Sequence, residues 1–258
     1  MPTCGYFNIF FDHSFNLANL LWATQFVANS KNTKTKEKMS TLSTNKILVC
    51  IYTCEKDRGS LEKLKSTDWY KDISTRNNFQ TVDVFADESI DEEFKLNNNT
   101  LTVKTEEAYD NLCIKTYKMI QACDKLFEFD YLLKIDSNII ENRHNKTSML
   151  FSFEYFLEKF YNSGVIGEYN GLTPIVGNTI ESFRSWANSK RLFVMPEVIA
   201  SELEDNRWPK SYWAGGCYCL GKKSISKILQ QKCLFDKFKN LMGGCEDMCI
   251  GSICMNYE

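Results

Sequence analysis

Three apolar runs separated by helical stretches constrain the fold of this chain most. The runs are 46–54 (KILVCIYTC), 79–87 (FQTVDVFAD) and 129–135 (FDYLLKI). Their continuous apolar character is typical of parallel strands that are buried on both faces of a sheet. Between them, 57–70 and 106–127 carry apolar residues at helical spacing. This alternation predicts an α/β fold with a mixed, mostly parallel sheet flanked by helices.

The second half of the chain is less regular. It predicts helices and short strands in the following order: a helix over 148–161, a strand over 164–167, a helix over 179–188, a strand over 192–195, a helix over 222–233 and a last helix from Glu246. The segment 101–104, in the first half, also predicts a short strand. Because we find no repeat and no second linker, we expect a single two-lobed domain over 45–258, with a nucleotide-binding front half and an acceptor-facing back half.

The first 44 residues predict two further segments. Residues 1–28 are apolar and aromatic, but Asp12 and His13 interrupt them, and the polar stretch 29–44 predicts a linker. The uninterrupted apolar part is too short to cross a bilayer comfortably, and the basic residues follow it, whereas they precede the apolar part of a signal peptide. We therefore expect an amphipathic segment that packs on the domain or on a partner, and no membrane anchor.

Charge and cysteine content exclude several classes of function. With 31 Lys and Arg against 33 Asp and Glu, the chain lacks the basic excess of a nucleic-acid-binding protein. Its eleven cysteines include no C-x-x-C pair and it has two histidines, which argues against a zinc site. We interpret most cysteines as buried free thiols in a reducing compartment, hence a cytoplasmic protein. The alternative is the Golgi or secretory lumen, with a disulfide among cysteines 217, 219, 245, 249 and 254.

Asp136, Ser137 and Asn138 directly follow a predicted buried strand. Ligands of open α/β sheets bind at the carboxyl ends of strands. Oxygen atoms of Asp136 and Asn138 there could bind a divalent cation that neutralises a diphosphate. The alternative is that Asp136 only caps a helix or a turn.

Glu246 and Asp247 open the last predicted helix, after the turn residues Gly243 and Gly244. A carboxylate at this place could act as the general base that removes a proton from an acceptor hydroxyl. The alternative is that both acids serve the helix dipole and its cap.

Two further groups are candidates for ligand contacts. The paired glycines Gly215 and Gly216 could let the backbone approach a ligand, and the aromatic side chains of Tyr212 and Trp213 could stack on a sugar. The alternative is a tight turn before a strand. A nucleotide would also meet side chains beyond the ends of the first two strands, where surface charges or caps are the alternative: Thr53, Arg58 and Asp87.

Five segments in this order resemble the β-1,3-glycosyltransferase family of galactosyl-, N-acetylglucosaminyl- and Fringe-type enzymes. They are 64–69 (LKSTDW), 109–116 (YDNLCIKT), 129–138 (FDYLLKIDSN), 208–220 (WPKSYWAGGCYCL) and 246–251 (EDMCIG). Together they extend over most of 45–254, and five ordered matches are far more specific than any one.

The resemblance implies a Rossmann-like GT-A domain, a UDP-sugar donor, Mn²⁺ or Mg²⁺ and transfer of a hexose, for which galactose is the best expectation, to a glycan or glycoprotein acceptor with inversion. It places Asp136 and Asn138 at the metal, and Asp247 at the catalytic base with Glu246 beside it. It places the following residues around the donor: Thr53, Arg58, Asp87, Lys115, Asp136 and Ser137.

The chain departs from the family pattern at the metal. Ser137 and Asn138 replace two acids, and no histidine follows His144. The chain also ends soon after the last motif, so we expect that it is one domain of a longer polypeptide, suited to a microbe or a large DNA virus that builds glycans in the cytosol.

Three rival functions remain. The first is a domain that binds glycans or nucleotide sugars without turnover. The second is another nucleotide-dependent α/β enzyme, against which the lack of a G-x-G-x-x-G or Walker sequence argues. The third is a scaffold that docks a partner through residues 1–28.

Overall fold

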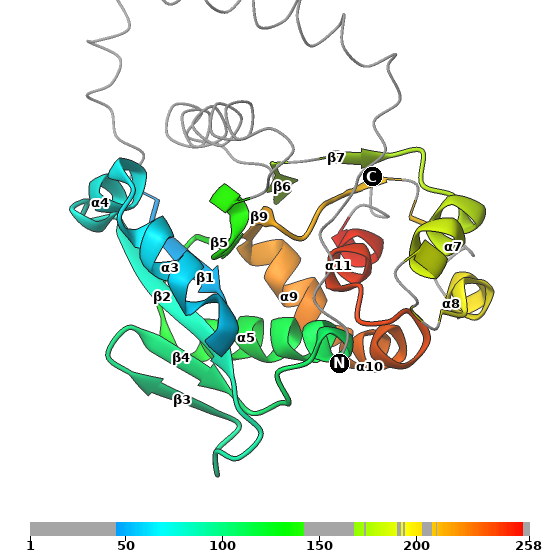
Figure 1. Ribbon diagram of the computed structural model, residues 1–258, viewed down its shortest axis with the longest axis horizontal. Helices are drawn as coiled ribbons and strands as arrows, with labels where there is room; N and C mark the ends of the chain where they lie inside the picture. The colour runs from blue at the N-terminus through cyan, green and yellow to red at the C-terminus, as the bar shows by residue number, and fades with distance from the viewer. Residues whose placement is uncertain are drawn as a thin grey trace, which may run out of the picture. The chain divides into compact units, whose positions relative to one another are not determined.

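The computed structural model describes residues 45–141 and 168–254, except 173, 190, 191, 193, 203–207 and 210. A seven-stranded sheet of order β3-β4-β2-β1-β5-β9-β6 forms its centre (Figure 1). The strands are β1 (Ile47–Tyr52), β2 (Phe79–Ala86), β3 (Phe94–Asn97), β4 (Thr100–Val103), β5 (Tyr131–Asp136), β6 (Tyr169–Gly171) and β9 (Cys217–Gly221). Strands β4, β2, β1 and β5 are parallel, whereas β3, β9 and β6 pair antiparallel with their neighbours. A second sheet pairs β7 (Pro174–Val176) with β8 (Ser211–Trp213).

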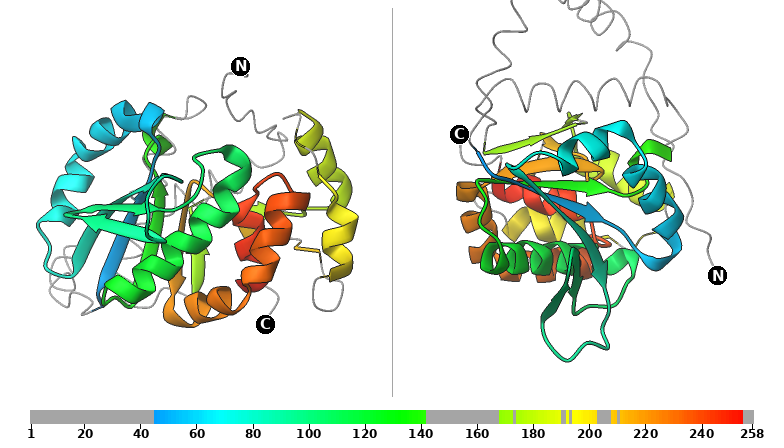
Figure 2. Two further views of the ribbon diagram at one scale, coloured as in Figure 1. Left: turned by 90° about the horizontal axis from the view of Figure 1, so that it is seen from below. Right: turned by 90° about the vertical axis from the view of Figure 1, so that its left-hand side faces the viewer.

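Helices cover both faces of the large sheet (Figures 1 and 2). Successive side chains of a strand point to opposite faces. In β1, Leu48 and Cys50 therefore join one core, and Val49 and Ile51 join the other. The first core lies under α5 (Leu112–Leu126), α9 (Lys222–Gln230), α10 (Lys232–Leu241) and α11 (Glu246–Cys254), and the second under α3 (Arg58–Lys65) and α4 (Asp68–Ser74).

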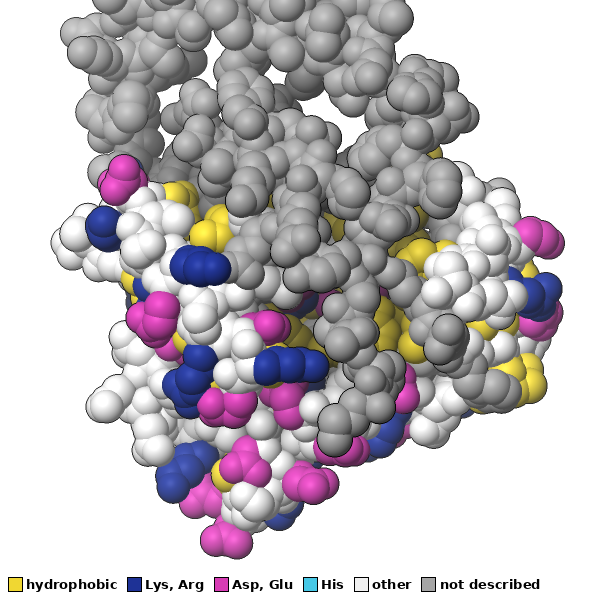
Figure 3. Space-filling model, in the orientation of Figure 1, with side chains coloured by type: hydrophobic (Ala, Val, Ile, Leu, Met, Phe, Trp, Pro, Cys, Tyr) yellow, Lys and Arg dark blue, Asp and Glu magenta, His cyan; other side chains and the backbone are white. Residues whose placement is uncertain are grey.

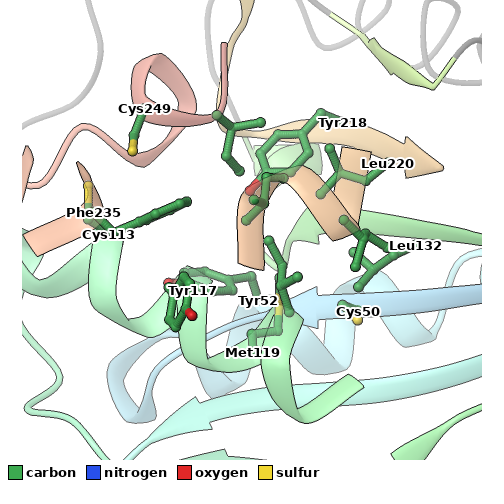
Figure 4. Close-up of a cluster of buried hydrophobic side chains, with 14 of the residues drawn as sticks. Cys50, Tyr52, Cys113, Tyr117, Met119, Leu132, Tyr218, Leu220, Phe235 and Cys249 are labelled. Carbon is green, nitrogen blue, oxygen red and sulfur yellow. The ribbon is translucent and has the colours of Figure 1, made fainter. Parts of the chain in front are cut away.

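The first core is the larger of the two. Figure 4 shows Tyr52 and Leu132 of the sheet facing Met119 of α5 and Phe235 of α10. It extends to α7 (Ile180–Ser189) and α8 (Pro196–Glu202), which lie beyond α11 in Figure 1. The predicted mixed α/β fold, with a sheet buried on both faces, is therefore confirmed.

Several predicted elements have different limits. The helix predicted over 57–70 is a 3-10 turn, η2 (Glu55–Asp57), followed by α3 and α4, because the Thr67 side chain accepts from the Tyr70 amide and starts a new helix. The helix predicted from 106 has extended backbone at Ala108, so it begins with η3 (Tyr109–Asn111) and continues as α5. The helix predicted over 222–233 is divided at Gln231 between α9 and α10.

The strand predicted over 192–195 is wrong in its described residues. The Leu192 amide donates to Ala187 in α7, and the Met195 amide donates to Leu241 in α10, so both belong to the connection between α7 and α8. The predicted strands 46–54, 79–87, 101–104 and 129–135 and the helices at 179–188 and Glu246 are confirmed. The elements predicted at 148–161 and 164–167 lie outside the described residues, as do segments 1–28 and 29–44.

All ten cysteines in the described part of the chain are free thiols, and seven of them are buried. The cysteines 217, 219, 245, 249 and 254, for which a disulfide was the alternative, are among them. Figure 3 shows Lys and Arg interspersed with Asp and Glu on one face of the molecule, which agrees with the balanced composition. Within 45–141 and the described parts of 168–254, none of the helices has the length and apolar character needed to cross a membrane.

Helix α11 packs closely against β8 at Gly251. A Cβ atom there would overlap the Cβ of Tyr212, so we expect Gly251→Ala to lower the free energy of unfolding by about 1–3 kcal/mol, as overpacking does. Gly59, in α3, has open space around it, and Gly59→Ala should stabilise by up to about 1 kcal/mol through helix propensity. Urea unfolding of both variants measures the difference; equal stabilities would contradict the close packing of α11.

Candidate functional site

The carboxyl ends of β1, β2 and β5 lie at one edge of the sheet, because Tyr52 pairs with both Val84 and Asp136. Thr53 and Ser137 follow two of these strands and are buried. The Ser137 hydroxyl donates to the Thr53 hydroxyl at 3.0 Å, and the Ser137 amide donates to the Tyr52 carbonyl at 2.9 Å. These two side chains therefore tie the strand ends together.

The turn between β8 and β9 brings the predicted acids to this edge. The Asp136 amide donates to the Gly216 carbonyl at 2.9 Å, and the Gly215 amide donates to Asp247 Oδ2 at 3.0 Å. A Cβ atom on Gly215 would lie 2.6 Å from Glu246 Oε1, so any side chain at this position would displace the Glu246 carboxylate. Residues predicted in three separate segments, 136–138, 215–216 and 246–247, therefore meet in one place.

Lys134 of β5 is the residue of this site that the sequence analysis missed. Its ammonium lies 2.6 Å from Asp136 Oδ1 and 3.2 Å from Glu246 Oε1, and it also donates to the Gly215 carbonyl. Burial alone would lower the pKa of Lys134, but the two carboxylates outweigh burial and raise it. A lysine inside an apolar strand was the available signal, because lysine is almost never fully buried unless paired.

Asp247 has a strongly perturbed acidity. Burial, followed by the neighbouring charge of Glu246, raises its pKa to about 7, although amides of Gly215 and Met248 and the charge of Lys134 act in the opposite direction. The Met248 amide donates to Asp247 Oδ1 at 2.8 Å, so each carboxylate oxygen has a backbone donor. A carboxyl group with a pKa near the working pH is suited to general base catalysis.

Lys115 of α5 contacts the end of β1 through Thr53. It is buried, its ammonium donates to the Thr53 carbonyl at 2.6 Å, and it lies 2.7 Å from Glu107 Oε2. Burial lowers the pKa of Lys115, and Glu107 opposes that effect. The structure thus places this predicted donor residue behind Thr53, whose backbone it holds.

Arg58 and Asp87 follow β1 and β2 along the chain, but each interacts with residues near it in sequence. Arg58 is exposed, lies 5.0 Å from the centre of the Phe85 ring and donates to Glu55 at 2.6 Å. Asp87 Oδ1 accepts from the amide and hydroxyl of Ser89, which lowers the pKa of Asp87. Their contacts in the described part of the chain do not include the acids around Gly215.

The two predicted sugar-stacking residues take part in packing. Tyr212 lies against Gly251 of α11, and burial raises its pKa. Trp213 lies against Gly171 of β6, where a Cβ atom would be 2.5 Å from the Trp213 Cβ. Both residues are half-buried.

The fit of the site to a divalent cation depends on Asp136 and Asn138. Asp136 is about one-third exposed (33%) and Asn138 is exposed, whereas Ser137 between them points inward to Thr53. Among the described residues, no three His, Cys, Asp or Glu side chains gather as a metal site. Mn²⁺ takes about six oxygen ligands, so these two side chains fit an ion that also binds diphosphate and water oxygens.

Comparison with known proteins adds one match. A family model described as galactosyltransferase matches residues 79–258, which is more than half of the chain. The matched residues include Asp136, Glu246 and Asp247. A search of curated proteins finds no match.

Proposed function

The chain belongs to the galactosyltransferase family and is a hexosyltransferase, and from this we propose that it moves galactose from a UDP-sugar to a hydroxyl of a glycan or glycoprotein acceptor. The observation that carries the proposal is the cluster of Asp136, Glu246 and Asp247 around the Gly215-Gly216 turn. Glycosyl transfer needs a place for a diphosphate and a base for a hydroxyl, and carboxylates gathered in one cluster support a proposal for both.

In the proposed reaction, Asp247 is the base. The acceptor oxygen forms a bond to the anomeric carbon as the bond from that carbon to the β-phosphate oxygen breaks. The bonding electron pair leaves with UDP, and the hydroxyl proton passes to Asp247. A single displacement of this kind inverts the anomeric configuration. The pKa of about 7 supports the role, because the group is ionised in part at neutral pH and can still take a proton.

The donor diphosphate is proposed to lie beside Asp136 and Asn138. A divalent cation bound there would offset the negative charge of the leaving group. Asp136 is held by Lys134 at one carboxylate oxygen, and Gly216 lies next to the other, where a side chain would begin 4.0 Å from Oδ2. The bare glycine leaves room for the donor at that oxygen.

Asn138 favours one second candidate, a domain that binds nucleotide sugars or glycans without turnover. An amide oxygen can bind a cation but supplies no charge to hold it, so this site attracts a cation less than one with two acids.

Calorimetric titration with UDP, UDP-galactose, UDP-glucose, UDP-N-acetylglucosamine and UDP-xylose, each with and without Mn²⁺, tests the proposal. We expect UDP-galactose to bind and Mn²⁺ to strengthen its binding. Incubation of the bound donor with an array of glycan acceptors then measures transfer. Binding without any product would favour the second candidate, and no binding to a folded sample would overturn both.

We also propose a cytosolic setting for the enzyme. Seven free cysteines are buried in the described part of the chain, and several of them lie in the apolar core. Thiols stay reduced in a reducing compartment such as the cytosol, which supports this setting. Cell fractionation checks this: recovery in a secretory compartment would contradict it.

A further inference from the structure

Two buried lysines lie close to the Tyr52 ring, with their ammonium nitrogens 4.4 Å (Lys115) and 4.6 Å (Lys134) from its centre. Each has a side-chain exposure of 2% and binds both a carboxylate and a backbone carbonyl. They differ in what they hold. Lys115 holds Thr53, whereas Lys134 holds Gly215.

The position of Gly215 makes this difference important. Its carbonyl accepts from Lys134, and its amide donates to Asp247 Oδ2 at 3.0 Å. The same ammonium binds Asp136 at 2.6 Å. A continuous chain of polar contacts therefore runs from Asp136 through Lys134 and the backbone of Gly215 to Asp247.

We propose that Lys134 is a positioning residue that aims the Asp247 carboxylate by holding Gly215, and that it fixes this carboxylate relative to Asp136. Lys134 is enclosed and does not touch the reacting atoms. Its kinetic consequence rests on the proposed function, but its structural consequence can be measured in the free protein.

The compact ammonium group matters for this role. It meets three acceptors, on Asp136, Glu246 and Gly215, within a closed space. The guanidinium of arginine keeps the charge but is planar and wider, so it cannot meet the same three acceptors in the same place. Lys134→Arg therefore separates positioning from simple charge neutralisation.

The amide of Gly215 can report on Asp247 by NMR. The ionisable groups that face Asp247 are Glu246, Cys245 and Cys249 in or beside its helix, Lys134 in β5, Tyr212 in β8 and Tyr169 in β6. Burial raises the pKa of both tyrosines and both cysteines, and the two carboxylates raise that of Lys134. The Gly215 signal in ¹⁵N-glycine-labelled protein should thus follow Asp247, and Asp247→Asn identifies it by removing its titration.

We expect Lys134→Arg to reduce the pH-dependent shift of the Gly215 amide and to lower kcat about 10²-fold, the cost of a misplacement near 1 Å. The matched control is Lys115→Arg, which should leave the Gly215 titration as in the wild type. If Lys134→Arg does not fold, Lys134→Met with Glu246→Gln removes both members of the buried pair and is judged by the same Gly215 shift.

If folded Lys134→Arg shows the Gly215 titration and the kcat of the wild type, the proposal is overturned. A positive charge that neutralises the carboxylates would then suffice without the geometry of the lysine ammonium. An equal change of the Gly215 titration in Lys115→Arg would also overturn it, since the effect would then be a general loosening around Tyr52. If the wild type binds no UDP-sugar, the proposed function fails, and the Gly215 titration still decides the role of Lys134.

Discussion

Asp247→Asn should lower kcat by about 10²- to 10⁴-fold, the usual contribution of a general base, while the dissociation constant for the UDP-sugar stays near its wild-type value. The amide has nearly the shape of the carboxylate but cannot take a proton. Single-turnover assays with bound donor measure the loss. Asp236→Asn is the matched control, because Asp236 pairs only with Lys232 among the ion pairs of the described residues and lies on the surface of α10. Wild-type turnover in Asp247→Asn would remove Asp247 from the mechanism.

Thermal unfolding at several pH values shows whether the Asp247→Asn variant is folded, and also tests the acidity of Asp247. The pKa of about 7 lies above the ordinary value of 3.8, so the folded wild type binds more protons than the unfolded chain between these values. The contribution of Asp247 to wild-type stability therefore declines as pH rises through this window, and an asparagine makes no such contribution. The melting temperature of the variant minus that of the wild type should become more positive from pH 5 to pH 8. A difference in melting temperature that stays constant with pH would mean that the pKa of Asp247 is not raised.

Asp136→Ala should weaken metal-dependent binding of the UDP-sugar by about 10- to 100-fold, the range expected when a charged hydrogen-bonding group is lost. Calorimetry with and without Mn²⁺ measures the change, and the effect of Mn²⁺ should disappear. Lys134 keeps Glu246 as a partner, at 3.2 Å, so the buried ammonium is not left alone. Asp124→Ala, which removes an exposed partner of Lys222, is the control. Unchanged Mn²⁺ dependence in Asp136→Ala would contradict the assigned site.

The sheet could be predicted from sequence because its central strands are buried on both faces. Apolar runs such as 46–54 then stand out, and the helices between them show their own period. The edge strand β3 was not predicted because three of its four residues are exposed, and β6 was not predicted because a three-residue strand carries little pattern. The break at Thr67 had a local signal, a capping side chain before an acid, although the prediction placed one helix over 57–70.

The candidate acids could be predicted from their place at strand and helix ends. The role of Lys134 could not, because it depends on contacts with residues far along the chain: Gly215 lies 81 positions away and Glu246 lies 112. The sequence shows that a lysine is present in β5 but not which carboxylates will face it. Likewise, the sequence could not show that the Ser137 side chain points inward, because this depends on its hydrogen bond to Thr53, which follows the neighbouring strand β1.

The tight packing of α11 has a consequence for the entropy of the reaction. Seven of its nine residues are buried, Gly251 lies against Tyr212, and backbone amides hold both oxygens of Asp247. A carboxylate held in this way has lost its rotational freedom when the chain folds. Little further ordering of this group is then needed when an acceptor arrives, so the barrier to proton transfer contains only a small contribution from the base itself.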